Sequence, residues 1–373
     1  MDNTTETPLP RRTTARSSRR RITGCLQVES LPASRNASLL ASRTLASRIH
    51  IEIIRHPSSD LVLDKSSVAK LLRMTPLVAI GRLQCTPSHP LFSYVGPVQC
   101  PFIGFMRSSV RRTVWHRDRS ASEIQTPNVA GFFSPECRYE REAIDVVGDD
   151  SDWIAVAPSL WSELCEALPT EAFSGTDGIS LRPFAPVSTS LYVTQRRFFE
   201  AAANQLEIDN VGIEERAIAI VRSALSTASS YWSRRGQRKH FRPSCERRRR
   251  EIVEDVKEQI ALNFRSNLSL KTLATFANST PAQLARIFPL QTGLTIHDYQ
   301  QSVRMRVSLD MLRNGHQSLN AAALELGYSS HSHFSYVFRR WFGLPPSDFA
   351  RSRGKVNELT MARTPRAKLQ LLR

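Results

Sequence analysis

Residues 280–288 combine the signals of a helix with side chains that could contact DNA bases. Thr280, followed by Pro281 and then Gln283, predicts a helix N-cap with a capping box. Three residues at helical spacing are predicted to face a core: Leu284, Ile287 and Phe288. The opposite face carries Ala282, Ala285 and Arg286, with Gln283 as the other main polar side chain. Arg286 can donate two hydrogen bonds to guanine, and alanine methyls can contact a thymine methyl. The alternative for Arg286 is a surface ion pair.

Residues 330–340 repeat this plan with a more polar outer face. Ser330 is the predicted N-cap, and the inward residues are Phe334, Val337 and Phe338. Four side chains then share the outer face: His331, Ser332, Ser335 and Tyr336. Arg339 and Arg340, further along, are better placed to contact phosphates, which adds affinity without sequence information. The alternative for Tyr336 is a half-buried position against Trp341.

Other chemistry finds little support in the sequence. His331 and His333 cannot face one metal ion from a helix because they are two positions apart. His89 and His116 are widely separated and lack companion ligands, and the six cysteines form no CxxC pair. No nucleophile–base pair or phosphate-binding glycine loop is present. We therefore predict no cofactor, no metal and no enzymatic activity.

Each polar segment is predicted to be the second helix of a helix-turn-helix. Short helices over 270–277 and 319–326 precede them, and a helix over 249–264 opens the region. A helix over 295–313 is apolar on two sides, so we expect it to be buried by both units and to set their separation. Pro289 predicts that the first recognition helix ends at Phe288.

Length and charge narrow the class of partner. The 373 residues suffice for two domains, and a net charge of +17 with pI near 10.3 favours a polyanion such as nucleic acid. No apolar run approaches the length of a membrane span. We expect reduced thiols and a cytoplasmic protein that is associated with the nucleoid when it binds DNA.

The N-terminal part divides by composition. Residues 1–73 are rich in Ser, Thr and Arg and are predicted to be a disordered basic extension. Residues 74–185 carry short apolar runs broken by Pro, Gly and Ser, which predict a small antiparallel sandwich or barrel. The runs are 77–83, 102–106, 110–115, 129–133, 143–147 and 153–157, followed by a helix over 158–168. A closed barrel of this kind can hold one small ligand.

Three further segments complete the predicted organisation. Amphipathic helices over 190–206 and 213–224 form a hairpin within 186–229 that could join two copies of the chain or pack on its own domain. Residues 230–249 are predicted to be a flexible basic linker that could also touch phosphates. The double helix-turn-helix occupies 250–353, and 354–373 form a basic tail.

Many residues of 250–353 match one family pattern: Leu273-Ala274, Thr280-Pro281, Leu284, Arg286, Phe288, Thr292-Gly293-Leu294, Tyr299, Arg304, Gly327-Tyr328, Ser330, Ser332, Phe334-Ser335, Phe338-Arg339-Arg340, Phe342-Gly343 and Pro346-Ser347. In these residues the chain resembles the AraC/XylS family of bacterial transcription regulators. Residues 74–225 more loosely resemble the cupin-like sensor domain found upstream in many members, through 131–135 and 149–153.

The resemblance implies an α+β multidomain chain. A cupin-like β-barrel or sandwich sensor domain and a helical linker would precede an all-α double helix-turn-helix domain. It also implies an activator that binds double-stranded DNA and RNA polymerase, responds to a small-molecule effector and can form a homodimer.

Two alternatives remain at this point. One is a cupin-type small-molecule binder or metal enzyme with a basic accessory domain. The other is non-specific nucleic-acid binding by charge alone, which predicts steep salt dependence without sequence preference.

Overall fold

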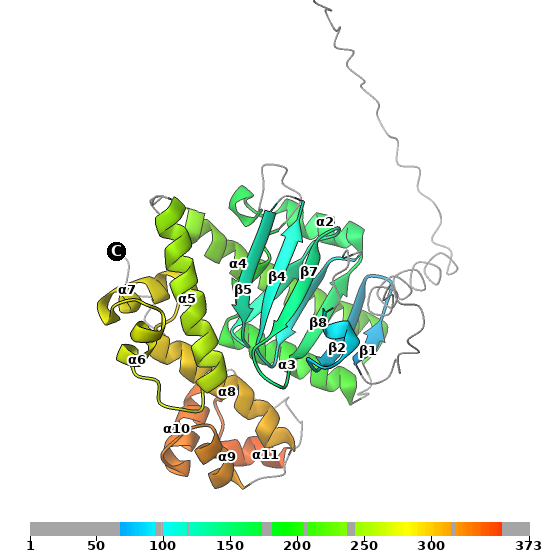
Figure 1. Cartoon of the computed structure of the whole chain (residues 1–373). Coiled ribbons are helices and arrows are strands. Elements are labelled where there is room, and N and C mark those ends of the chain that lie inside the picture. The colour runs from blue at the N-terminus through cyan, green and yellow to red at the C-terminus, as the bar shows by residue number, and fades with distance from the viewer. Residues whose placement is uncertain are drawn as a thin grey trace, which may run out of the picture.

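The computed structural model describes residues 68–352 except 94–97, 99, 118, 174–180, 205–207, 237–242 and 315–317. Most of the predicted basic extension, residues 1–67, and the predicted tail, 354–373, lie outside the described residues. Within the described part, a β-rich N-terminal half is followed by a helical C-terminal half (Figure 1). None of the described helices is long and apolar enough to cross a membrane.

The larger sheet has six strands, and each is antiparallel to its neighbours. Their spatial order is β1 (Ala69–Met74), β2 (Val78–Cys85), β8 (Asp149–Val156), β3 (Phe102–Met106), β6 (Val129–Phe133) and β9 (Phe184–Pro186). Alternate residues such as Ile80, Ile103 and Ile154 are fully buried on one face, where they join the main apolar core. The first strand begins five residues before the predicted start of this domain at Met74.

A second sheet faces the first and has three antiparallel strands. They are ordered β5 (Arg119–Gln125), β4 (Val110–His116) and β7 (Arg138–Ala143). Phe133 from the larger sheet packs against Tyr139 and Val114 from the smaller one. No described strand pairs across the two sheets, so the predicted sandwich is confirmed and the barrel is not closed.

Five of the six predicted strands are present, as β2, β3, β4, β6 and β8. The predicted strand over 143–147 is wrong, because Ala143 is the last residue of β7 and 144–147 form a turn in which Val146 is 87% exposed and Val147 is 52% exposed. β5 and β7 were missed because they are rich in charged residues and have one face in solvent. Their position next to β4 stabilises them through cross-strand pairing.

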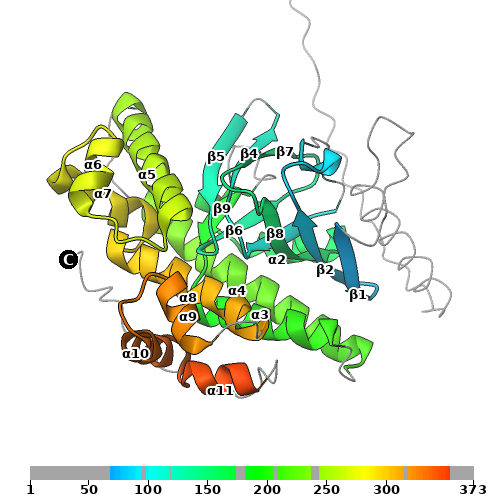
Figure 2. The same ribbon diagram turned by 60° about the horizontal axis from the view of Figure 1, so that its bottom comes forward.

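Helices cover the outer face of the larger sheet (Figure 2). They are α2 (Pro158–Glu166), α3 (Thr189–Ala203) and α4 (Asn210–Gly236), with the short 3-10 turn η2 (Thr170–Ala172). The other 3-10 turn, η1 (Pro90–Ser93), lies on the opposite side, next to β7. Phe199 on α3 and Trp232 on α4 are buried in the same core as the sheet. The Trp232 indole donates to the carbonyl of Phe184 at 3.0 Å. Of the two predictions for this hairpin, packing on its own domain is therefore observed.

The predicted basic linker, 230–249, is mostly helical, and the prediction of a flexible tether is wrong for its described residues. Its first part continues α4 to Gly236, and its last part begins α5 (Pro243–Asn263). The reason is tertiary contact at both ends. The Tyr231 hydroxyl donates to the carbonyl of Gln291 at 2.6 Å, and the Gln291 amide donates to Glu246 at 2.9 Å.

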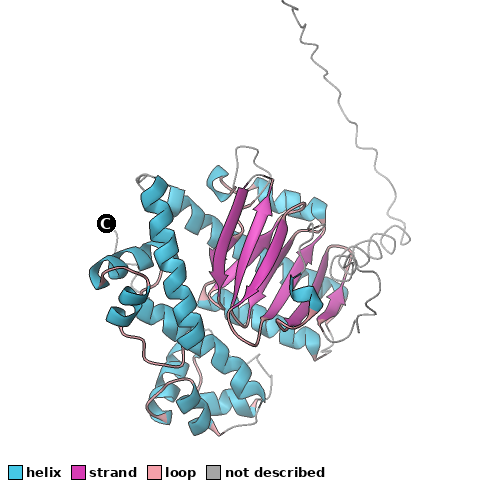
Figure 3. Cartoon of the chain, in the orientation of Figure 1, coloured by secondary structure: helices cyan, strands magenta, loops and turns pink. Residues whose placement is uncertain are grey.

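The described residues of the C-terminal half form helices and no strands (Figure 3). After α5 come α6 (Leu270–Phe276), α7 (Pro281–Thr292), α8 (Ile296–Asn314), α9 (Leu319–Glu325), α10 (His331–Phe342) and α11 (Pro346–Arg351). One core joins α5, α6 and α7 to the first half of α8, including Tyr299 and Val303. The second half of α8, with Met305 and Leu309, packs with α9, α10 and α11 in the main core. The prediction that α8 is buried on two sides is confirmed.

Candidate nucleic-acid interface

The helix pairs α6–α7 and α9–α10 are two copies of one plan. Corresponding positions in α7 and α10 lie 50 residues apart: Thr280 and Ser330, Leu284 and Phe334, Phe288 and Phe338, Gly293 and Gly343. Each begins with a side-chain N-cap and ends at a glycine in the left-handed conformation. The same local signals therefore build both recognition helices.

In α7 the predicted inward and outward faces are observed. The Thr280 hydroxyl accepts from the Gln283 amide at 3.1 Å, as expected of an N-cap. Leu284, Ile287 and Phe288 are buried. The outer face presents the predicted residues Ala282, Ala285 and Arg286 as exposed and Gln283 as half-buried. No described acidic side chain forms an ion pair with Arg286.

The predicted end of α7 at Phe288 is wrong. The helix continues through Pro289 to Thr292, and Gly293 closes it by donating its amide to the Pro289 carbonyl. A proline inside a helix removes one backbone hydrogen bond, here the bond to the carbonyl of Ala285. Ala285 is exposed, so water can satisfy that carbonyl. The burial of Ile287 and Phe288 then offsets what the proline costs.

In α10 the polar outer face is also observed. The Ser330 hydroxyl accepts from the His333 amide at 3.2 Å, and Phe334 and Phe338 are fully buried. Ser332, Arg339 and Arg340 are exposed, whereas His331, Ser335 and the predicted inward residue Val337 are half-buried. Tyr336 is 65% exposed, which is more than a half-buried position against Trp341 would leave.

The two histidines of α10 have separate surroundings. The Nε2 of His331 lies 3.3 Å from the Ser335 hydroxyl, one helical turn away. The ring of His333 instead packs edge-on against Tyr328, with 5.3 Å between ring centroids. His331 and Ser335 thus form a hydrogen-bonding pair on the outer face, where either group can donate to or accept from a base.

A junction between α8, the loop after α5 and the turn before α10 holds the two units together. Arg304 on α8 donates to the carbonyls of Phe264 and Ser266 at 2.5 and 2.8 Å. Gln300 donates to the same two carbonyls at 3.1 and 2.7 Å. These bonds satisfy the loop between α5 and α6, which belongs to the first unit. Arg304 also lies over the ring of Tyr328 in the second unit, 5.6 Å from its centroid.

Gly327 closes this junction from the side of the second unit. Its φ of +80° lies in the left-handed region, which most side chains disfavour. A Cβ at this position would collide with the carbonyl oxygen of Arg265. The family pattern contains Arg304 and Gly327-Tyr328, and these contacts give the physical reason for those residue types.

The interior of the N-terminal sandwich contains charged side chains. Arg112 and Arg141 both donate to Asp149, and all three side chains are at most 4% exposed. Burial acts to raise the pKa of Asp149, but the two guanidinium groups outweigh it and lower that pKa. Arg112 also lies over the rings of Phe133 and Tyr139. The space between the sheets that was expected to hold a small ligand is thus partly filled by this cluster.

His89 and His116, the described histidines of the N-terminal half, have separate surroundings. His89 accepts from the amide of Leu91 at 3.1 Å, and His116 lies at the end of β4. Among the described residues, no group of three or more His, Cys, Asp or Glu side chains is arranged to hold a metal ion.

Comparison with known proteins places the C-terminal half in a family. Residues 273–352 match the family model described as a helix-turn-helix domain. Regulatory protein SoxS of Escherichia coli K12 is 30% identical over 99 residues, which cover 26% of this chain and 92% of SoxS. The chain belongs to the AraC family of transcription regulators.

Two other relatives are matched over less of their own length. An uncharacterised helix-turn-helix regulator from Haemophilus influenzae is 34% identical over 83 residues, covering 22% of this chain and 28% of the relative. The activator RhaR of Mannheimia succiniciproducens is 38% identical over 72 residues, 19% of this chain and 26% of RhaR. Among solved structures, ToxT from Vibrio cholerae is similar over 74% of this chain and 96% of its own, with 11% identity and a TM-score of 0.27.

Proposed function

We propose that this protein is a sequence-specific DNA-binding transcription regulator that inserts α7 and α10 into successive major grooves. The observation that carries the proposal is the pair of capped helices, each with an exposed outer face, on opposite ends of one buried spacer helix. An α-helix fits the major groove, and grooves on one face of DNA recur roughly every 34 Å. One chain could then bind an asymmetric site with two elements.

The exposed side chains suggest different roles for the two helices. In α7, Arg286 is the candidate for guanine, Gln283 is a second polar contact, and Ala282 and Ala285 can contact thymine methyls. In α10, the candidates for base contacts are His331, Ser332, Ser335 and Tyr336. Arg339 and Arg340 at the end of α10 are assigned to phosphates.

The N-terminal half is proposed to sense a small-molecule effector and to allow dimerisation. Its boundaries follow the sequence: a sensor domain at 74–185, a helical hairpin at 186–229 and a connecting segment at 230–249, before the DNA-binding domain at 250–353. The outer face of α4 supports dimerisation, because Val211 is 61% exposed there and Glu215 and Arg222 can pair with a second copy. RNA polymerase is the expected partner at a promoter.

SoxS, RhaR and the Haemophilus influenzae relative are described as regulators, which supports this function over a cupin-type enzyme. Selection from a random DNA library with the full chain tests it. We expect enrichment of a two-element site with a fixed separation near one helical turn, roughly 10 base pairs. Binding of all sequences alike, with steep salt dependence, would leave charge-driven binding as the correct description.

A further inference from the structure

The spacer helix α8 has a third face, which is polar and lies against the N-terminal half. We call it the docking face, and it consists of Tyr299, Ser302, Arg306, Asp310 and Arg313. These residues recur every three or four positions, so they share one side of the helix. Ser302 and Arg306 are only 1% and 2% exposed. A polar face this deeply buried needs partners, and the N-terminal half supplies them.

Hydrogen bonds hold the first part of the docking face. Asn128, just before β6, donates to the Tyr299 carbonyl at 3.1 Å and accepts from the Ser302 hydroxyl at 2.7 Å. Arg306 donates to the carbonyl of Val187 at 2.7 Å. Each of these bonds joins segments more than 100 residues apart in the sequence. This part of α8 is thus fixed to the loops that flank β6 and β9.

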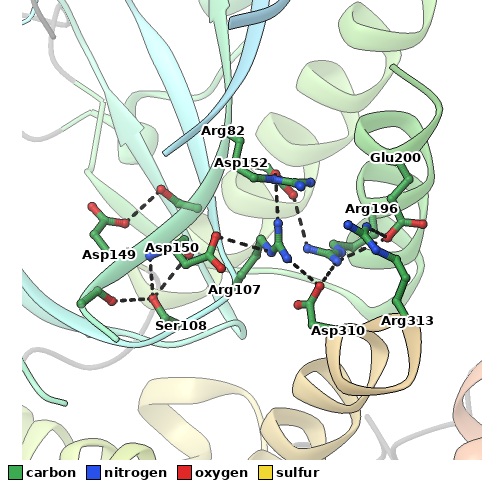
Figure 4. A network of polar contacts seen from close by, with 12 residues as sticks. Arg82, Arg107, Ser108, Asp149, Asp150, Asp152, Arg196, Glu200, Asp310 and Arg313 are labelled. Carbon is green, nitrogen blue, oxygen red and sulfur yellow. Dashed lines mark hydrogen bonds and ion pairs between the residues drawn. The ribbon is translucent and has the colours of Figure 1, made fainter. Parts of the chain in front are cut away.

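Ion pairs hold the second part of the docking face (Figure 4). We call the five residues that form them the clasp: Arg107, Arg196, Glu200, Asp310 and Arg313. Asp310 accepts from Arg107, which directly follows β3, at 2.7 Å, and from Arg196 on α3. Arg313 donates to Glu200, also on α3, at 2.7 Å. Arg107 and Arg196 are 8% and 2% exposed, whereas Asp310 retains 21%.

Strand β8 fixes the clasp arginines from the other side. Asp152, fully buried, lies 3.5 Å from Arg196 and accepts from Arg82 at 2.8 Å. Asp150 lies 3.5 Å from Arg107. The guanidinium groups that face Asp310 are therefore held by the sheet, so they move with the N-terminal half.

The charges of this network favour an ionised Asp310. Burial acts to raise its pKa, but Arg196, Arg107 and Arg313 outweigh burial and lower the pKa below its ordinary value. Breaking a buried ion pair by removing one partner leaves an uncompensated charge, which is more costly than breaking a surface pair. The clasp therefore stabilises one position of α8 relative to the N-terminal half.

We infer that Asp310 is a positioning residue through which the N-terminal half sets the separation of the two recognition helices. The inference rests on the proposed function. α8 gives Tyr299 and Val303 to the core of the first unit and Leu309 and Leu312 to the core of the second. The clasp lies at the end of α8 that packs with the second unit, whereas α5 of the first unit is separately ion-paired to β5 of the N-terminal half. Loss of the clasp therefore frees the second unit's end of α8 alone, and the separation of α7 and α10 can change. A displacement of α3 or of the turn after β3 is transmitted to the recognition helices through the clasp and α8.

Asp310→Asn in the full chain is the central test, because it removes the charge and keeps the size. We expect its affinity for the selected site to fall about 5- to 30-fold. We also expect it to discriminate less than the unchanged protein against a site with one base pair inserted between the two elements. Arg107→Gln, at a position in the N-terminal half, should behave in the same way. The double variant should lose less than the sum of the two single losses, because both remove one interaction.

Asp348→Asn is the matched control. Asp348 is an exposed carboxylate on α11 with a surface partner, Arg351, at 3.5 Å. The affinity of Asp348→Asn for the selected site should stay within about twofold of that of the unchanged protein. The thermal midpoint of each variant shows whether it is folded.

Hydrogen exchange without DNA provides a readout that does not depend on the proposed function. The amides of 296–314 should exchange faster in Asp310→Asn and Arg107→Gln than in the control. If the unchanged protein selects no DNA sequence, the proposed function fails while this arm still decides whether the clasp holds α8. The inference is overturned if Asp310→Asn is folded and any one of three quantities is unchanged: amide exchange over 296–314, affinity for the selected site, or discrimination against the site with an inserted base pair. It is also overturned if the affinity falls equally for every spacing of the two elements.

Discussion

The two helix-turn-helix units have matching backbones but different side chains at matching positions. After Phe288 the first recognition helix continues with Pro289 and Leu290, whereas after Phe338 the second continues with Arg339 and Arg340. The outer face of α7 is built largely of alanine, whereas the outer face of α10 is built of His, Ser and Tyr. Packing thus preserves the shape of both helices, while the exposed polar side chains proposed to contact DNA are concentrated in α10.

The turns of the two units differ in the same way. The first turn uses Asn278 in the left-handed conformation, with φ +45°, and the second uses Gly327, with φ +80°. Asparagine is one of the few other residues that adopts this conformation readily. Glycine is needed only in the second turn, because there the Arg265 carbonyl leaves no space for a Cβ. The close contact between this turn and the Arg265 backbone therefore ties the two units together, whereas the turn of the first unit does not require glycine.

Gly327→Ala should have the largest effect. The added methyl collides with the Arg265 carbonyl at a left-handed φ, so we expect the free energy of unfolding to fall by about 3 kcal/mol. Gly293→Ala is the control, because its φ is also left-handed and nothing lies within 4 Å of an added Cβ. The control should lose about 1 kcal/mol. Urea unfolding measures both, and equal losses would show that the junction contributes nothing.

The next largest effects should come from the side chains of α7 and α10 that are proposed to contact bases. We expect Tyr336→Ala to weaken binding to the selected site by about 2 kcal/mol, and Arg286→Ala to weaken it by roughly 1–3 kcal/mol and to relax one base position. A loss that is equal for every sequence would reject a base contact for either residue. If Arg286→Ala weakens binding to the selected site more than His331→Ala and Tyr336→Ala together, α7 rather than α10 is the dominant recognition helix.

Pro289→Ala tests the cost of a proline that only α7 contains. Alanine restores the backbone hydrogen bond to the Ala285 carbonyl, so we expect the free energy of unfolding to rise by about 1 kcal/mol. Pro281→Ala is the control, since a proline at the first helical position loses no helical bond. Thermal unfolding of the two variants gives the comparison. A decrease for Pro289→Ala would indicate that the proline is favoured by its packing.

Arg340→Gln should have the smallest effect. An arginine on a phosphate adds affinity to all sequences alike, so the slope of log affinity against log salt should fall by about 1. Leu290, the matching residue of α7, should leave this slope unchanged when replaced by Gln. Fluorescence anisotropy at several salt concentrations measures the slope. A loss confined to one DNA sequence would instead place Arg340 on a base.

The C-terminal half could be predicted closely because its signals are local. Thr280 and Ser330 were predicted as N-caps, and both accept the expected backbone hydrogen bond. The inward faces of α7 and α10 followed from helical spacing, since residues three or four apart lie on one side. The DNA contacts assigned to the outer faces stay predictions. The error at Pro289 arose because a local rule was applied where burial of neighbouring residues decides the outcome.

The N-terminal half was predicted less completely. Strands β3 and β6 are apolar and were located from the sequence, whereas β5 and β7 carry charges and became strands by pairing with β4. The cluster of Arg112, Arg141 and Asp149 was also missed, because each residue alone resembles a surface charge. Only the facing of two sheets buries them together.

Local sequence patterns define two helix-turn-helix units, their caps and a spacer helix with two apolar sides. These features depend on residues a few positions apart, and helical periodicity places such residues together whatever the rest of the chain does. Only the tertiary structure decided that α8 has a third, polar face. Asp310 meets Arg107 and Arg196 from more than 100 residues away, and only the folded chain brings those charges together. The position of α8, and with it the separation of the recognition helices, is therefore a property of both halves.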